Sequence, residues 1–251
     1  MSSHFACVGF PVQDMDGYWI LARRAAQEGE RATTADGGML ARWAPGGGVE
    51  IWAHLNASGE VVGAVPFFSP DHPYRISVIG TGDDPDEEME GWIDGWLEPV
   101  EGDEPFSGAF PLRADLVNYA LTRTRLVSFP ALHRVELAAL PHEAELFDDE
   151  AAYARAPGDV YRLPLGSFTS AAHFGADEDS DAAQESAALF SGHIISAQAQ
   201  ANPVTGARFW WIKVMPQGAM LHVFADEETL GGEPAEGRIL SASCWMLGKL
   251  L

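Results

Sequence analysis

Basic side chains are scarce in this sequence of 251 residues, where 15 Lys and Arg stand against 37 Asp and Glu and the formal net charge is -22. A chain this negative repels phosphate backbones, and no cluster of Lys and Arg offsets that repulsion locally. We therefore expect no binding to nucleic acid. The acidic side chains gather in residues 83–104, 143–150 and 177–185. These clusters indicate either solvated faces or a docking surface for a basic partner.

Cysteine and long hydrophobic runs are also nearly absent. Cys7 and Cys244 each lie in an apolar stretch, which favours two buried thiols over a disulfide framework. No apolar run reaches the roughly 18 residues that cross a bilayer. The start, "MSSHFACVGF", lacks the basic and apolar segments of a secretory signal. We expect a cytoplasmic protein, monomeric or homodimeric, with no membrane span.

The first part of the chain predicts the element order β-α-β-β-β. Residues 4–12, "HFACVGFPV", have the composition of a strand. Asp14 or Asp16 is a plausible N-cap for a helix that ends at Gly29. Residues 38–68 predict three strands joined by two glycine-containing turns. The central one of these strands alternates, and its apolar face is the predicted core face.

The middle of the chain predicts a helix followed by mixed structure. Apolar side chains recur at helical spacing within the acidic run, at Met89, Trp92, Ile93, Trp96 and Leu97. Residues 106–147 predict strands and one short helix, with Pro141 at a break or an edge. Residues 169–185 are small and acidic, which indicates an exposed connection.

The last part of the chain predicts four strands without a helix between them. A small antiparallel barrel in residues 186–251 would remove the edges of such a sheet. The predicted class is therefore α+β with mainly antiparallel strands. Its predicted parts are an α+β domain in residues 1–168, an acidic linker in 169–185 and the barrel in 186–251.

A run of aromatic residues, "ARFWWIKV", supplies the candidate ligand-binding face. On two neighbouring strands the alternation places one set of side chains together, namely Phe209, Trp211, Lys213, His222 and Phe224. This face is too apolar to stand in water as one patch. The N-terminal domain, a second copy of the chain, or a ligand that stacks on aromatics would cover it.

The best candidate metal ligands are imidazole and carboxylate groups near residue 140. They are His133, Glu136, His142 and Glu145, with His4 and Glu50 in support. Such ligands suit zinc, manganese or iron. The alternative is chance proximity in a carboxylate-rich chain, because His133 and Glu136 point to opposite faces of a strand. Glu143 and Glu145 are a candidate carboxylate pair for acid–base work or a solvated rim.

Residues 4–66, with the strand "HFACVGFPV" and the helix after "QDMDGYW", resemble one module of the vicinal oxygen chelate (glyoxalase-type) fold. The resemblance implies a divalent metal held on the first and last strands, and His4 matches the first-strand ligand. The last strand, "VVGAVPFF", has no such side chain after Glu60. Residues 186–251 are similar in strand pattern to oligonucleotide/oligosaccharide-binding (OB) barrels. Taken whole, the sequence resembles an uncharacterised bacterial family.

Three functions follow from these patterns. The leading expectation is a non-catalytic binding or interaction protein without a cofactor, whose partner is an unidentified protein or small molecule. The first alternative is a metal-dependent enzyme of the vicinal oxygen chelate type. The second alternative is an acidic mimic that binds a basic partner through residues such as Glu87, Glu88 and Glu90.

Overall fold

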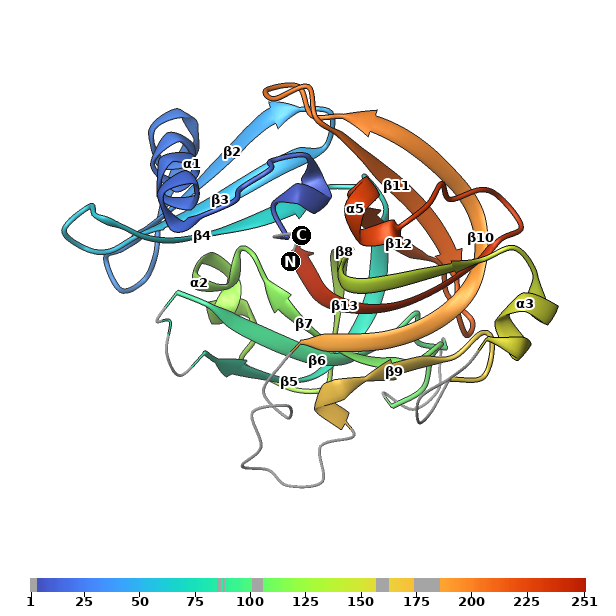
Figure 1. The fold of residues 1–251 in the computed structure, drawn as a ribbon. Helices are drawn as coiled ribbons and strands as arrows, with labels where there is room; N and C mark the ends of the chain where they lie inside the picture. The colour runs from blue at the N-terminus through green and yellow to red at the C-terminus, as the bar shows by residue number, and fades with distance from the viewer. Residues whose placement is uncertain (1–3, 85–86, 88, 101–105, 157–162, 174–185) are drawn as a thin grey trace.

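The computed structural model describes residues 4–84, 87, 89–100, 106–156, 163–173 and 186–251. Strands dominate these residues, and they form a four-stranded antiparallel sheet and a nine-stranded mixed sheet (Figure 1). The predicted class, α+β with mainly antiparallel strands, is confirmed at this level. Within the described residues, no helix is both long and apolar enough to cross a membrane.

The small sheet comes from the first part of the chain together with one helix. The elements are α1 (Met15–Glu28), β1 (Glu30–Thr33), β2 (Met39–Gly46), β3 (Val49–Leu55) and β4 (Val61–Phe68). The strands lie in the order β1-β2-β3-β4, each antiparallel to its neighbour. The three strands predicted for residues 38–68 are confirmed as β2, β3 and β4.

Helix α1 covers one face of this sheet (Figure 1). Asp14 is its N-cap and accepts a hydrogen bond from the Gly17 amide at 2.8 Å, and Gly29 is its C-cap. The apolar positions predicted to recur along it are buried at Leu21, Ala22, Ala25 and Ala26. The predicted helix is therefore confirmed.

Residues 4–12 do not form the predicted strand. Their one regular element is a 3₁₀ turn, η1 (Ala6–Val8), and Gly9 follows it with a left-handed φ of 78°. Four apolar side chains are buried on more than one side of this segment: Phe5, Cys7, Val8 and Phe10. A 3₁₀ turn followed by a left-handed glycine does not extend the backbone as a strand does. The predicted β-α-β-β-β order is therefore wrong at its first element, and the observed order begins with η1 and α1.

The large sheet takes its strands from the remainder of the chain. They are β5 (Pro73–Asp83), β6 (Gly91–Leu97), β7 (Pro111–Leu116), β8 (Ala131–Phe147), β9 (Phe168–Ser170), β10 (Ala187–Ala201), β11 (Arg208–Met215), β12 (Leu221–Ala225) and β13 (Ile239–Leu250). Short helical elements lie between them: α2 (Tyr119–Thr122), η2 (Arg123–Arg125), α3 (Glu150–Arg155), η3 (Ala171–His173) and α5 (Glu227–Leu230). The break predicted at Pro141 coincides with a register shift between β8 and β13.

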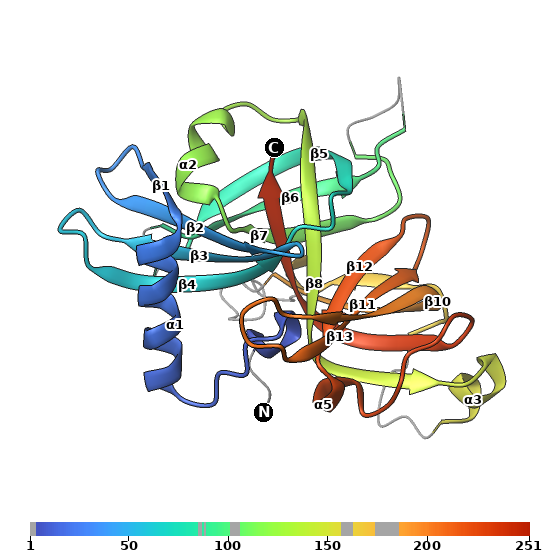
Figure 2. The ribbon, with the colours of Figure 1, turned by 90° about the horizontal axis from the view of Figure 1, so that it is seen from above.

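The paired strands of the large sheet close into two rings, each described below by the route from strand to strand. One route runs β5-β6-β7-β13-β8 and back to β5, and the other runs β8-β12-β11-β10-β13 and back to β8. Strands β8 and β13 belong to both routes and run side by side through the middle of the molecule (Figure 2). A barrel made from residues 186–251 alone is not confirmed, because its strands pair with β8 from the preceding part of the chain.

The helix predicted over Met89–Leu97 is wrong, since these residues contain strand β6. Ile93 and Leu97 are fully buried while Trp92 and Trp96 are partly exposed, which is the alternation of a strand. Gly95 allows the close packing, because a Cβ there would lie 2.7 Å from Ile76. The spacing of apolar residues in this segment fits both periods.

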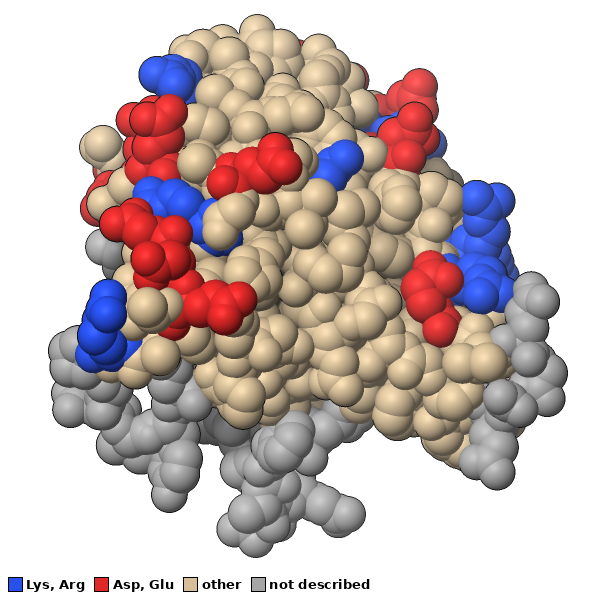
Figure 3. Space-filling view, turned by 90° about the vertical axis from the view of Figure 1, so that its right-hand side faces the viewer, with Lys and Arg blue, Asp and Glu red and all other residues tan. Residues whose placement is uncertain are grey.

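The remaining connections are only partly described. Of the predicted linker 169–185, the described residues form the end of β9 and η3, and residues 174–185 lie outside the description. Strand β10 carries no Asp, Glu, Lys or Arg along its 15 residues. The side of the molecule where β10 lies shows a wide uncharged area between charged side chains (Figure 3). The excess negative charge is therefore not spread evenly over the described surface.

Candidate functional site

The two sheets pack against each other through a mixed interface that contains the predicted aromatic face. Phe209 and Phe224 are 1% and 0% exposed. The ring of Phe68, at the end of β4, stacks on Phe224 with centroids 4.3 Å apart and also contacts Phe209 and Trp211. The N-terminal part of the chain therefore covers this half of the face, while Trp211 and Lys213 remain partly exposed.

The candidate metal ligands on β8 do not come together. His133 and His142 are nine residues apart on one strand, which is about 30 Å at 3.3 Å per residue. Glu145 lies three residues beyond His142, opposite Ser241. Among the described residues, no group of three or more His, Cys, Asp or Glu is arranged to hold a metal ion.

Two other members of that candidate set do meet. Nε2 of His4 lies 3.0 Å from Nδ1 of His142, within hydrogen-bond distance. Burial, together with the smaller effect of the neighbouring His142, lowers the pKa of His4 to about 4. Two of the candidate metal ligands therefore contact each other as a pair of imidazoles.

Glu136 and Glu50 belong to a buried ionic network between the sheets. Nζ of Lys249 lies 2.7 Å from Glu136 and 3.0 Å from Glu50, and Ser69 donates to Glu136 at 2.6 Å. Glu50 also accepts hydrogen bonds from Arg42 and, at 2.9 Å, from the Trp52 indole. These partners occupy both carboxylates, so the network joins the sheets and leaves neither group free for a metal.

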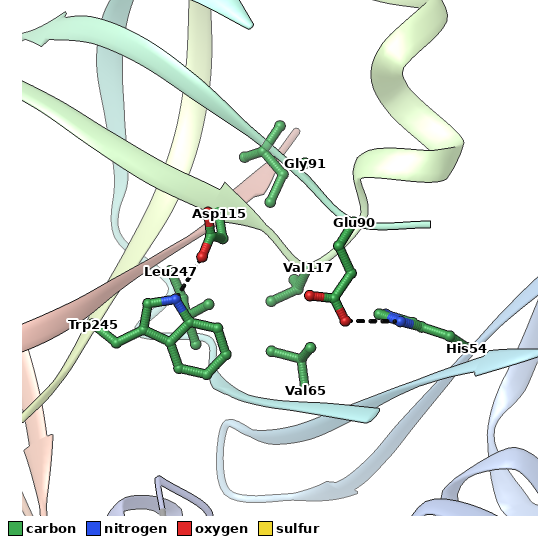
Figure 4. Close-up of a pocket in the computed structure, with 9 residues that line it drawn as sticks. His54, Val65, Glu90, Gly91, Asp115, Val117, Trp245 and Leu247 are labelled. Atoms are coloured by element: carbon green, nitrogen blue, oxygen red, sulfur yellow. Dashed lines mark hydrogen bonds and ion pairs between the residues drawn. The ribbon is translucent and has the colours of Figure 1, made fainter. Parts of the chain in front are cut away.

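A cavity lies between the small sheet and strands β6, β7 and β13 (Figure 4). The empty space between its side chains measures about 220 Å³, part of it open to solvent. It is lined by His54, Val65, Glu90, Gly91, Asp115, Leu116, Val117, Trp245 and Leu247. The residues come from both sheets, so the cavity exists only because the sheets pack together.

Two acid-containing pairs face this cavity. Oε1 of Glu90 lies 3.2 Å from Nδ1 of His54, a side chain of β3 that is 2% exposed. On the other side, the indole of Trp245 donates to Asp115 at 2.6 Å (Figure 4). The hydroxyl of Ser186 donates to the same carboxyl group. Gly63, opposite His54 on β4, leaves room for the imidazole, since a Cβ there would lie 3.4 Å from Nδ1.

Burial raises the pKa of Asp115 to about 6. The hydrogen bonds from Ser186 and Trp245 oppose this rise, and the negative charges of Glu90 and Asp84 add to it. A carboxylate that lacks a cationic partner in such a place is stabilised by any cation that reaches it. The cavity therefore combines two acidic groups with an aromatic wall.

Sequence reasoning missed this cavity. It placed His54 on the polar face of β3 with Glu50 and Trp52, which was the available signal, but it took the opposite face as the core. In the structure every residue of β3 is buried, because α1 covers one face and the large sheet covers the other. No family model matches the chain, and no curated protein matches it.

Replacing Asp115 with asparagine is expected to change how stability depends on pH. A folded-state pKa above the ordinary value of 3.8 means that the carboxyl group favours folding below about pH 4 and opposes it above pH 6. The free energy of unfolding of the native protein should therefore fall, relative to the Asp115→Asn variant, by about 2 to 3 kcal/mol between pH 4 and pH 7. Urea unfolding of both proteins at several pH values measures this. A difference that stays constant with pH would show that Asp115 has an ordinary pKa.

Proposed function

We propose that this protein is a non-catalytic binding protein that receives a primary ammonium group, such as a lysine side chain of a basic partner, in the cavity between its sheets. The observation that carries the proposal is the convergence of Glu90 and Asp115 on one cavity walled by Trp245. None of the described residues that line it is Lys or Arg. An ammonium ion in the cavity would be attracted by the negative charge of both carboxylates and by the π face of the indole ring.

The size of the cavity favours binding over catalysis. The cavity has room for about one water-sized group, far less than pockets for drug-sized ligands, which begin at ~300 Å³. An ammonium group is about that size. A basic partner whose ammonium group enters the cavity would agree both with the expected binding protein and with the alternative of an acidic mimic.

The strand order supports a finer proposal about the fold. In chain order the strands of this ring are β5, β6, β7, β8 and β13. The first three form a meander, β7 is parallel to β13, and α2 lies between β7 and β8. We propose that this ring is an OB-like barrel, made from other strands than those predicted for residues 186–251. Ligands of such barrels lie on the second and third strands, here β6 and β7, which carry Gly91 and Asp115 of the cavity.

The test is a titration of the full chain with methylammonium chloride, followed by the indole N–H signal of Trp245. We expect saturable binding that strengthens as the pH rises through about 6, because only the ionised Asp115 attracts the cation. The Glu90→Gln variant should bind about tenfold more weakly, since it loses one carboxylate charge next to the cation. Glu143→Gln changes the net charge equally on an exposed part of β8 and serves as the matched control.

Two outcomes would reject the proposal. One is an indole signal that does not respond to methylammonium beyond its response to sodium chloride. The other is an equal loss of affinity in Glu90→Gln and Glu143→Gln, which would reduce the effect to the overall charge. Tetramethylammonium is a second probe, and it should fail to bind because the cavity is too small for it.

A further inference from the structure

The exposed end of the aromatic face, away from the cavity described above, contains a polar group without a partner. His222 on β12 is 2% exposed, and its Nδ1 accepts a hydrogen bond from the Trp211 indole at 2.8 Å. Burial, together with the smaller effects of the charges of His72 and Lys213, lowers the pKa of His222 to about 3. The ring is therefore neutral near pH 7, with Nδ1 as an acceptor.

The tautomer of His222 follows from this hydrogen bond. A neutral imidazole carries one proton, and a nitrogen that accepts from the indole does not hold it. The proton is therefore on Nε2, which is buried and has no hydrogen-bond partner among the described residues. The same reasoning excludes a metal ion at Nε2, because the ring would then have to be protonated at Nδ1. What Nε2 lacks is a hydrogen-bond acceptor.

A positive charge without an acidic partner lies beside this donor. Lys213 is directly opposite His222 on the neighbouring strand, so both side chains project from the same face. Its ammonium group lies 5.3 Å from the centre of the Trp211 ring, and no ion pair joins it to a described carboxylate. In a chain with 37 Asp and Glu, an unpaired lysine on the same face as an unpaired N–H group is a combination that an anion would satisfy.

We propose that Lys213 and His222 form a binding site for a carboxylate. One carboxylate oxygen accepts from Nε2 of His222, and the other pairs with the ammonium group of Lys213, so two donors serve two oxygens. A phosphate would bring more negative charge to an acidic protein and would leave acceptors without donors. The ring of His72, an exposed residue, lies 5.1 Å from the ring of His222 and would have to move for a ligand to reach Nε2.

The test is a titration of the isotopically labelled full chain with sodium acetate at constant ionic strength. The Trp211 indole N–H signal, identified by its loss in Trp211→Phe, should shift and saturate because the indole donates to the other nitrogen of His222. Lys213→Met should weaken acetate binding about tenfold, since it removes a charge-assisted contact. Arg134→Met, which removes an exposed charge from β8, should leave the affinity unchanged within about twofold.

Three results would overturn the proposal. The first is a Trp211 signal that responds to acetate no more than to sodium chloride. The second is a Lys213→Met variant that binds acetate as tightly as the native protein does, with the other indole signals showing an intact fold. The third is tighter binding of inorganic phosphate than of acetate, which would assign the site to another anion. The proposal does not depend on the ammonium cavity, because the two sites share no residue.

Discussion

Replacing Lys249 with methionine is expected to lower the free energy of unfolding by about 3 to 5 kcal/mol. Lys249 lies between the carboxylates of Glu136 and Glu50, which are 5% and 1% exposed. Burial acts to raise the pKa of Glu50, but the hydrogen bond from Arg42 and the charge of Lys249 outweigh it and hold that pKa below its ordinary value. Methionine fills a similar volume and leaves Glu136 without a positive partner. Urea denaturation measures the loss.

A second substitution distinguishes this cause from a packing defect. In the double variant Lys249→Met with Glu136→Gln, no uncompensated charge remains next to Ser69, so we expect about half of the lost stability to return. A packing defect would persist or grow in the double variant. A loss below about 1 kcal/mol for Lys249→Met alone would show that water reaches the network and screens it.

This network also shows why the packing of the two sheets could not be predicted from the sequence. Glu50 lies on β3 and Lys249 near the end of β13, and nothing in the spacing of two residues 199 positions apart indicates a contact. The alternation in β3 was visible, and it correctly separated Glu50 and His54 from the apolar face. Alternation reports which residues share a face, but it does not report whether a second layer covers that face.

The elements with strong local signals were predictable for physical reasons. Helix α1 begins after Asp14 and ends before Gly29. Both ends were predictable because a capping carboxylate and a terminal glycine influence only the adjacent turn of the helix. Strand β6 was mistaken for a helix because Trp92 and Trp96 satisfy both periods. Its strand form depends on Gly91 and Gly95 fitting tightly against Tyr119 and Ile76, which are distant in the sequence.

The two candidate sites also differ in whether local or long-range strand pairing creates them. The contact of Trp211 with His222 follows from the pairing of two adjacent strands, so the alternation found it. The cavity of Glu90, Asp115 and Trp245 requires the pairing of β13 with β7, which no local pattern encodes. Long-range pairing therefore decides which polar residues of this chain meet.

The last prediction concerns the ring that covers the aromatic run. Phe68→Ala is expected to lower the free energy of unfolding by about 3 to 5 kcal/mol, because it removes a buried ring and leaves a cavity. Phe68 is 3% exposed, and it stacks on Phe224 while contacting Phe209 and Trp211. Phe106→Ala, at a position that is 58% exposed, should change stability by no more than about 0.5 kcal/mol.

The form of the unfolding curve tests the same idea. Phe68 belongs to the small sheet while Phe209 and Phe224 belong to the large one, so the ring couples the two sheets. If Phe68 is one of several contacts that make the described chain one cooperative unit, native protein and Phe68→Ala should each unfold in a single transition seen equally by fluorescence and by circular dichroism. Two separate transitions in the native protein would contradict this coupling. Two transitions only in Phe68→Ala would show that this one aromatic contact joins the sheets into a single unit.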